Sequence, residues 1–226
     1  MPATMKREIA IELGTATLHA VLRIPPGMRA VVLFAHGSGS GRRSPRNNFV
    51  AQRLSQSGIA TVLADLLSAQ EEQIDAVTAQ LRFDIALLSD RLRAATEWAR
   101  RQSALRGYPI GFFGASTGAA AALVAATRVA DLLAVVSRGG RPDLAGAALE
   151  QVRAPTLLIV GSEDREVLAL NRSALAALHC RSRLEVIAGA THLFPEPGAL
   201  EQVAARATAW FEQCLNPDLA GARDMP

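Results

Sequence analysis

Residues 110–118 read IGFFGASTG, an apolar run that leads into the pentapeptide Gly114-Ala115-Ser116-Thr117-Gly118. This pattern predicts a strand at 110–113, a tight turn, and an Ala-rich helix from Ser116 to about Thr127. Only small neighbours fit such a turn, and a serine held between a strand and a helix is typical of a nucleophile. The alternative is a glycine-rich turn in which Ser116 only caps the helix. Residues in the other loops distinguish a nucleophile from a cap.

Strands and helices alternate on both sides of this segment. Two alternating stretches within 9–23 predict an antiparallel pair of strands, and the apolar run AVVLFA at 30–35 predicts a central parallel strand. Further strands are expected at 59–63, 133–136, 156–160 and 184–187, and further helices at 44–58, 85–101, 144–152, 167–178 and 200–215. The alternation predicts an α/β fold with a mostly parallel sheet of about eight strands and helices on both faces.

The length of 226 residues fits a single domain over 1–226, with 216–226 expected to be a loose tail. The arginines are scattered among carboxylates, which argues against a nucleic-acid partner. Cys180 and Cys214 lack metal-ligand spacing, so we expect neither a metal nor a cofactor. The first residues are too polar for a signal peptide and no apolar run is long enough to span a membrane, which predicts a cytoplasmic protein without a membrane partner.

The loop after the 30–35 strand reads His36-Gly37-Ser38-Gly39-Ser40-Gly41. Acyl transfer needs two backbone N–H groups aimed at the oxyanion, one from the residue after the nucleophile and one from a loop after an early central strand. We assign these donors to Thr117 and Ser38, with Gly39 as the alternative to Ser38. A phosphate-binding loop is the other interpretation, but the Gly-Lys-Ser/Thr ending of such loops is absent.

An acid and a histidine follow in the order that a Ser-acid-His triad requires in this fold. Asp164 lies in the loop after the 156–160 strand, with Glu163 as the alternative. Of the four histidines, only His192 occupies a loop at a carboxyl strand end downstream of both the serine and the acid. The sequence therefore predicts the triad Ser116, Asp164 and His192.

Four arginines flank the expected mouth of this site: Arg42, Arg43, Arg138 and Arg141. We assign Arg42 and Arg138 to substrate binding, which would suit an anionic substrate. Asp65 and Asp143 could position the substrate, although such residues more often cap turns. Many relatives insert a helical cap between the strand expected at 133–136 and the next helix. Here only residues 137–143 lie between the two, so no large cap domain is expected. Residues 69–80 form either a flap over the site or an ordinary surface helix.

Five motifs extend over most of the chain: HGSGSGRRSPRNN (36–48), GASTGAAAAL (114–123), SRGGRPDLAG (137–146), PTLLIVGSED (155–164) and GATHLFPEPGALEQV (189–203). They resemble the dienelactone hydrolase-like branch of the α/β-hydrolase superfamily, in a bacterial subgroup with a serine nucleophile. The resemblance implies the α/β-hydrolase fold. Members of this subgroup are sometimes fused to a phosphoribosyltransferase-like domain, which we do not expect here.

The resemblance implies a carboxylesterase that cleaves short-chain esters or lactones through an acyl-enzyme intermediate. Serine stands at position 116 where true dienelactone hydrolases have cysteine, so a general ester is the safer expectation than a dienelactone. The alternatives are an acyltransferase, which shares the triad, and a non-catalytic α/β-hydrolase homologue. The expected partner is a small-molecule ester or lactone, and the sequence leaves the oligomeric state open.

Overall fold

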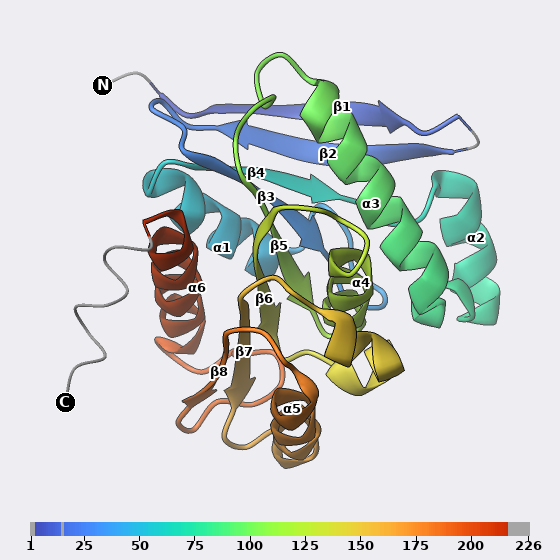
Figure 1. The fold of residues 1–226 in the computed structure, drawn as a ribbon. Helices are drawn as coiled ribbons and strands as arrows, with labels where there is room; N and C mark the ends of the chain where they lie inside the picture. The colour runs from blue at the N-terminus through green and yellow to red at the C-terminus, as the bar shows by residue number, and fades with distance from the viewer. Residues whose placement is uncertain (1–2, 15, 217–226) are drawn as a thin grey trace.

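The computed structural model describes residues 3–14 and 16–216, which form one sheet with helices on both faces (Figure 1). The strands are β1 (Met5–Glu12), β2 (Thr17–Ile24), β3 (Ala30–Ala35), β4 (Ile59–Ala64), β5 (Ile110–Ala115), β6 (Leu132–Arg138), β7 (Thr156–Gly161) and β8 (Ser182–Ile187). They lie in the order β1-β2-β4-β3-β5-β6-β7-β8. β2 runs antiparallel to β1 and β4, and the other neighbouring pairs are parallel. The predicted eight-stranded, mostly parallel sheet is confirmed.

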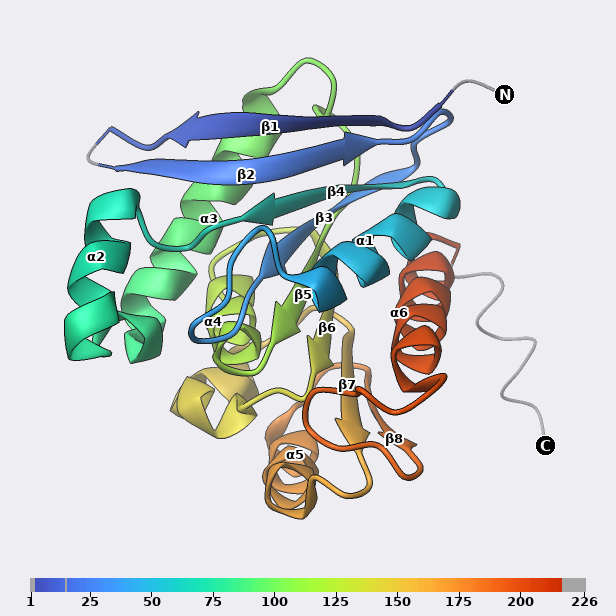
Figure 2. The same ribbon diagram turned by 180° about the vertical axis from the view of Figure 1, so that it is seen from behind.

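The helical segments are α1 (Pro45–Gln56), α2 (Ala69–Thr78), η1 (Leu81–Phe83), α3 (Ile85–Arg101), α4 (Thr117–Ala126), η2 (Pro142–Gln151), α5 (Arg165–Ala177) and α6 (Ala199–Leu215). Figures 1 and 2 show α1 and α6 on one face of the sheet, and α3 and α4 on the other. None of the helices in the described ranges is long and apolar enough to cross a bilayer. All but the first residue of the predicted tail at 216–226 lies outside the described residues.

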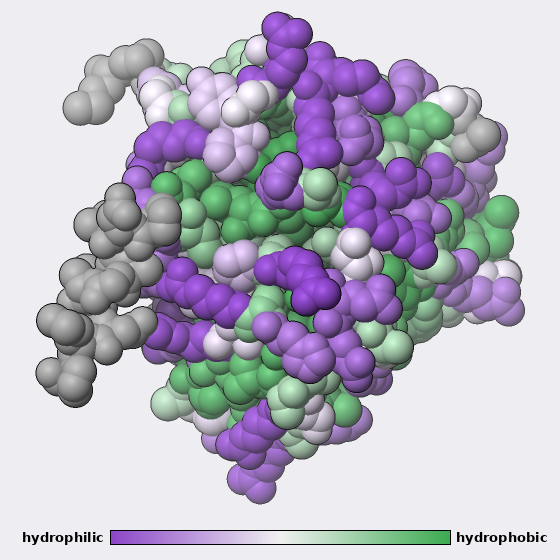
Figure 3. Space-filling model, in the orientation of Figure 1, coloured by the Kyte–Doolittle hydropathy of each residue, from purple (hydrophilic) through white to green (hydrophobic). Residues whose placement is uncertain are grey.

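The core has two layers because the central strands are covered on both faces. Every residue of β3, β4, β5 and β7 is buried, as continuous apolar runs predict for strands inside a parallel sheet. The predicted amphipathic helix α3 buries Leu88, Leu92, Ala95 and Ala99 along one stripe. On the face shown in Figure 3, hydrophilic residues are spread over the surface between hydrophobic ones.

One segment differs from the sequence expectations, and a second agrees with one of the two alternatives left open. The residues expected near 144–152 to be an α-helix form the 3-10 segment η2, which is kinked at Gly146, where φ is 53°. Residues 69–80, expected to be either a flap or an ordinary surface helix, contain the regular helix α2. The carboxylate of Glu71 on α2 pairs with Arg91 of α3 at 2.6 Å, which ties α2 to the main body.

The capping box at the start of α2 generates a stability prediction. The hydroxyl of Ser68 accepts a hydrogen bond from the backbone N–H of Glu71 at 3.2 Å, and the Glu71 carboxylate accepts one from the N–H of Ser68 at 2.7 Å. Ser68→Ala should lower the free energy of unfolding by about 1 kcal/mol and speed hydrogen exchange in α2. Ser68→Asp, which keeps a capping acceptor, should stay close to wild type; equal losses in both variants would contradict this role of the cap.

Candidate active site

Ser116 occupies a strained turn between β5 and α4. Its φ of 51° and ψ of −123° lie outside the regions that non-glycine residues ordinarily adopt. Its neighbours must be glycine for want of space: a Cβ at Gly118 would lie 2.2 Å from the carbonyl oxygen of Ala35, and one at Gly114 would lie 2.4 Å from the Cα of Ala119. The turn therefore depends on close backbone packing against β3 and α4.

Backbone hydrogen bonds hold this turn from three sides. The N–H of Ser116 donates to the carbonyl of Arg138 at 3.2 Å. The carbonyl of Ser116 accepts from Ala119 at 3.0 Å and from Arg141 at 3.1 Å. Although Ser116 stands at the N-cap position of α4, its side chain makes no capping hydrogen bond. The alternative interpretation, a serine that caps the helix, does not describe this side chain.

The predicted acid and histidine lie against each other. Nδ1 of His192 is 2.6 Å from Oδ2 of Asp164, across the loops that follow β7 and β8. Asp164 is the residue just before α5, but its side chain does not cap that helix. An Nδ1–H that donates to a carboxylate fixes the ring tautomer and leaves Nε2 as the acceptor. Glu163, the alternative acid, instead accepts a hydrogen bond from the Ser162 hydroxyl at 3.0 Å.

The loop after β6 brings His192 to the side of the sheet that holds Ser116. A Cβ at Gly139 would lie 3.1 Å from the carbonyl oxygen of His192 and 3.5 Å from its Nδ1. The preceding residue, Arg138, accepts the hydrogen bond from Ser116 described above. Within the described part of the chain, the Ser116 hydroxyl makes no hydrogen bond to His192, a contact that often tightens only when substrate is bound.

The predicted oxyanion loop packs directly on the Ser116 turn. A Cβ at Gly37 would lie 3.0 Å from the Cβ of Ser116. The N–H of Ser40 donates to the carbonyl of Gly37 at 3.2 Å, which closes a tight turn, and Gly39 supplies the positive φ of 65° within it. A cavity of about 210 Å³ opens here, lined by the loop and by Thr117. The assignment of the donors to Ser38 and Thr117 remains a prediction.

His36 fixes the start of this loop from beneath, a role that the sequence did not indicate. Its Nδ1 donates to the carbonyl of Gly37, and its Nε2 accepts from the N–H of Leu66, each at 3.0 Å. Both bonds require the neutral ring with its proton on Nδ1. Burial lowers the pKa of His36 from its ordinary value of 6.5, and the backbone bond to Gly37 and the charge of Asp65 oppose this shift without cancelling it.

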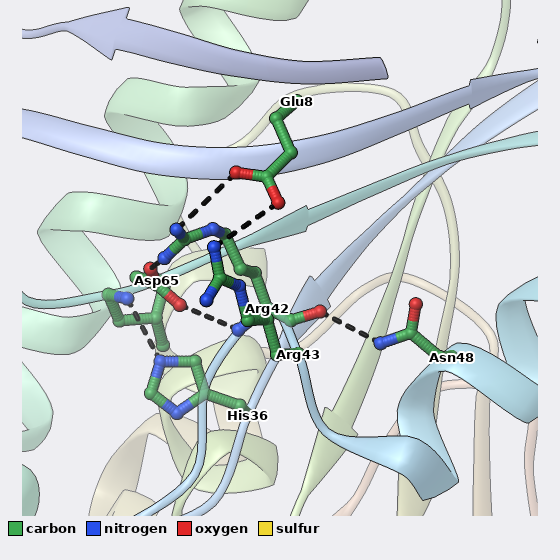
Figure 4. A network of polar contacts seen from close by, with 7 residues as sticks. Glu8, His36, Arg42, Arg43, Asn48 and Asp65 are labelled. Atoms are coloured by element: carbon green, nitrogen blue, oxygen red, sulfur yellow. Dashed lines mark hydrogen bonds and ion pairs between the residues drawn. The ribbon is translucent and has the colours of Figure 1, made fainter. Parts of the chain in front are cut away.

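Asp65 holds the far end of the same loop through Arg42 (Figure 4). One carboxylate oxygen accepts the backbone N–H of Arg42 at 2.6 Å, and the other contacts its guanidinium. Arg42 also pairs with Glu8 on β1 at 3.5 Å. This side chain therefore serves the structure of the loop, and its assignment to substrate binding remains a prediction that these contacts do not favour.

The other arginines at the expected mouth differ in their partners. Arg43 pairs with Glu8 at 3.4 Å, and Arg141 makes a two-pronged pair with Asp143 at 2.7 and 2.9 Å. Asp143 and Asp65 thus both bind arginine. Arg138 is buried, and no carboxylate pairs with it among the described residues.

Comparison with known proteins places the chain in a family. A model of the dienelactone hydrolase family matches residues 18–216. The chain belongs to the dienelactone hydrolase family. A crystal structure of a dienelactone hydrolase from Anabaena variabilis superposes with a TM-score of 0.91 at 51% identity, over 93% of this chain and 98% of that one. The resemblance expected from the motifs is confirmed, and membership supports a hydrolase.

Two further proteins resemble the chain, one in its fold and one in its sequence. Est1E from Butyrivibrio proteoclasticus has a TM-score of 0.77 at 15% identity, over 92% of this chain and 98% of its own, and shows the shared fold alone. A Mycobacterium tuberculosis H37Rv protein, provisionally named a phosphoribosyl transferase, is 50% identical over 212 residues. The match covers 93% of this chain and 47% of that protein, so the chain spans about half the length of the curated relatives it matches.

The neutral His36 predicts a pH-dependent stability. Because the folded-state pKa lies below 6.5, the unfolded chain takes up the proton first as the pH falls. The free energy of unfolding should therefore decrease below pH 6.5, by up to about 1.4 kcal/mol per pH unit, until the pH passes the folded-state pKa. Denaturant unfolding between about pH 5.5 and 7.5 measures this contribution, in a range where ordinary carboxylates stay ionised.

His36→Gln is the matched control for this titration, because its amide can accept a hydrogen bond but does not titrate. The variant should show a flatter pH dependence than wild type over the same interval. If both proteins show the same slope, the slope does not come from His36.

Proposed function

We propose that this protein is a serine hydrolase that cleaves short-chain carboxylic esters or lactones through an acyl-enzyme intermediate. The observation that carries the proposal is the Ser116 hydroxyl, which sits in a strained turn at a helix start without capping that helix. The oxyanion loop packs against Ser116, and a His192–Asp164 pair of 2.6 Å lies in the adjoining loops. Membership of the dienelactone hydrolase family supports the same chemistry.

In the first half of the reaction, the Ser116 oxygen attacks the ester carbonyl while Nε2 of His192 takes its proton. Asp164 keeps the ring in the tautomer that can accept this proton, and stabilises the imidazolium that forms. The tetrahedral oxyanion lies between the backbone N–H groups of Thr117 and Ser38. The imidazolium then gives its proton to the departing alkoxide, and Ser116 is left acylated.

In the second half, His192 takes a proton from water as the water attacks the acyl carbonyl. Collapse of the second tetrahedral intermediate returns the proton to Ser116 and releases the carboxylic acid. An acyltransferase differs only in that an alcohol replaces water in this half. Product analysis in the presence of added alcohol separates the two, because a hydrolase keeps releasing mostly the free acid.

The cavity beside the oxyanion loop fits a small acyl group. Its volume is about 210 Å³, and α2 and η1 form the wall opposite Thr117. The apolar part of the lining comes from Leu67, Ala76 and Leu88. Helix α2, within the 69–80 segment, therefore borders the cavity and is tied to α3 by the Glu71–Arg91 pair of 2.6 Å.

Removal of the proposed nucleophile tests this function directly. Ser116→Ala should lower kcat/KM for 4-nitrophenyl butyrate by about 10⁴-fold or more, since it removes the oxygen that attacks the ester carbonyl. Asp164→Asn should lower kcat by a similar factor, because the amide favours the wrong tautomer of His192. Glu163→Gln is the matched control and should retain wild-type kinetics. Full activity in Ser116→Ala would refute the proposal.

The wall of the cavity generates a separate prediction about acyl length. Ala76→Phe should fill part of the cavity and lower kcat/KM for 4-nitrophenyl hexanoate relative to acetate by roughly 10-fold. Val77→Phe, at the neighbouring position on α2, adds the same ring to a side chain that is 88% exposed and should leave the ratio unchanged. An unchanged ratio in Ala76→Phe would place the acyl group elsewhere.

A further inference from the structure

Both ends of the oxyanion loop are bound to the segment that follows β4 (Figure 4). At the start of the loop, Nε2 of His36 accepts a hydrogen bond from the N–H of Leu66 at 3.0 Å. At its end, the carboxylate of Asp65 accepts one from the backbone N–H of Arg42 at 2.6 Å. The proposed oxyanion donor, the N–H of Ser38, lies between these two attachments. Its position is therefore set from the end of the strand that pairs with β3.

Asp65 is itself held in place. The residue is 4% exposed, and its N–H donates to the carbonyl of His19 on β2 at 2.9 Å. A Cβ at Gly41 would lie 2.7 Å from Oδ1 of Asp65, so only glycine fits where the loop passes the carboxylate. The carboxylate is thus fixed between β2 and the loop, and it can anchor the loop for that reason.

Asp65 also places a negative charge under the loop. Burial raises the pKa of Glu72, which lines the cavity; the charge of Asp65 raises it further, and the charge of Arg42 lowers it. Burial lowers the pKa of His36, and the charge of Asp65 opposes that shift. The field of this carboxylate therefore reaches the cavity in which the oxyanion is proposed to form. Like charges repel, so an unneutralised Asp65 would oppose the tetrahedral intermediate.

Arg42 supplies the neutralising charge. Its guanidinium contacts the carboxylate of Asp65 and pairs with Glu8 at 3.5 Å. The side chain of Arg42 is 18% exposed, so solvent and salt screen this pair only in part. Among the described residues, Arg42 is the one basic side chain that pairs with Asp65. Without it, an almost completely buried carboxylate would be left unpaired beside the loop.

We propose that Asp65 and Arg42 form a positioning pair for the reaction. Asp65 holds the oxyanion loop in place, and Arg42 cancels the charge that Asp65 would otherwise present to the oxyanion. The inference rests on the proposed function, because it requires an oxyanion beside the N–H of Ser38. Neither side chain touches the substrate, so this role of Arg42 differs from the substrate binding that the sequence predicts.

Arg42→Met leaves Asp65 without its counter-charge. It should lower kcat for 4-nitrophenyl butyrate by roughly 10-fold to 100-fold, because an oxyanion forms in both halves of the reaction. KM should change by less than about twofold, since acylation and deacylation slow together. The inhibition constant of butyl trifluoromethyl ketone, whose adduct with the serine carries the same oxyanion, should rise by a similar factor. Arg42→Lys, which keeps the charge, should recover most of the loss.

The double variant Asp65→Asn/Arg42→Met separates the charge from the anchoring. The asparagine can still accept the N–H of residue 42, but it carries no charge that has to be cancelled. The double variant should therefore have a kcat at least about fivefold higher than that of Arg42→Met, although it differs more from wild type. If the pair only anchors the loop, the double variant should be no faster than Arg42→Met.

Arg43→Met is the matched control. Arg43 is the next residue in the chain and pairs with the same Glu8 at 3.4 Å, but its side chain is 75% exposed and it makes no pair with Asp65 in the described structure. Its loss should leave kcat, KM and the inhibition constant unchanged. If Arg42→Met does not fold, Asp65→Asn and Asp65→Ala decide the anchoring role. The asparagine should be at least about 10-fold faster than the alanine, and equal rates would overturn the proposal.

The outcomes separate this inference from the proposed function. If wild type cleaves the ester and Arg42→Met has the same kcat, the pair does not position the oxyanion loop and the hydrolase stands. A raised KM with unchanged kcat in Arg42→Met would assign Arg42 to substrate binding and also overturn the proposal. If wild type cleaves no ester, the proposed function fails and the positioning role fails with it.

Discussion

The backbone turn at Ser116 is the constraint on which the rest of the site depends. A non-glycine residue with φ of 51° is strained, and the strain persists because the turn is wedged between β3 and α4. Gly118 has no room for a side chain against the carbonyl oxygens of Ala35 and His36. The same packing that exposes the serine hydroxyl also fixes where the oxyanion loop starts, so nucleophile and loop are positioned by one contact.

Charge is distributed around this turn in two ways. On the side of the oxyanion loop, Arg42 pairs with Asp65 and Glu8. The neutral ring of His36 links the loop to the backbone N–H of Leu66, just after β4. On the other side, Arg138 and Arg46 are left without carboxylates in the described structure. The first arrangement makes a rigid scaffold, and the second leaves the buried guanidinium of Arg138 with a long hydrogen bond to Asn47 and a contact with the Phe194 ring.

Much of the architecture follows from local signals in the sequence. The apolar run of β3 matches the predicted strand at both ends, and α1 lies within the helix expected at 44–58. At 69–80 the capping box of Ser68 and Glu71 is a sequence signal that favours the helix α2 over a flap. The contacts of Arg42 and Arg138 depend on residues distant in sequence, so periodicity and spacing could not supply them. The order of Ser116, Asp164 and His192 was predictable, but their mutual geometry was not.

Covalent capture of Ser116 shows whether this side chain is the nucleophile that becomes acylated. The protein is treated with a fluorophosphonate, and the adduct is located by intact-mass and peptide mass spectrometry. We expect one adduct per chain, on Ser116, formed quickly in wild type and much more slowly in His192→Ala, where the proton acceptor is missing. An adduct on another residue, or none in folded protein, would contradict it.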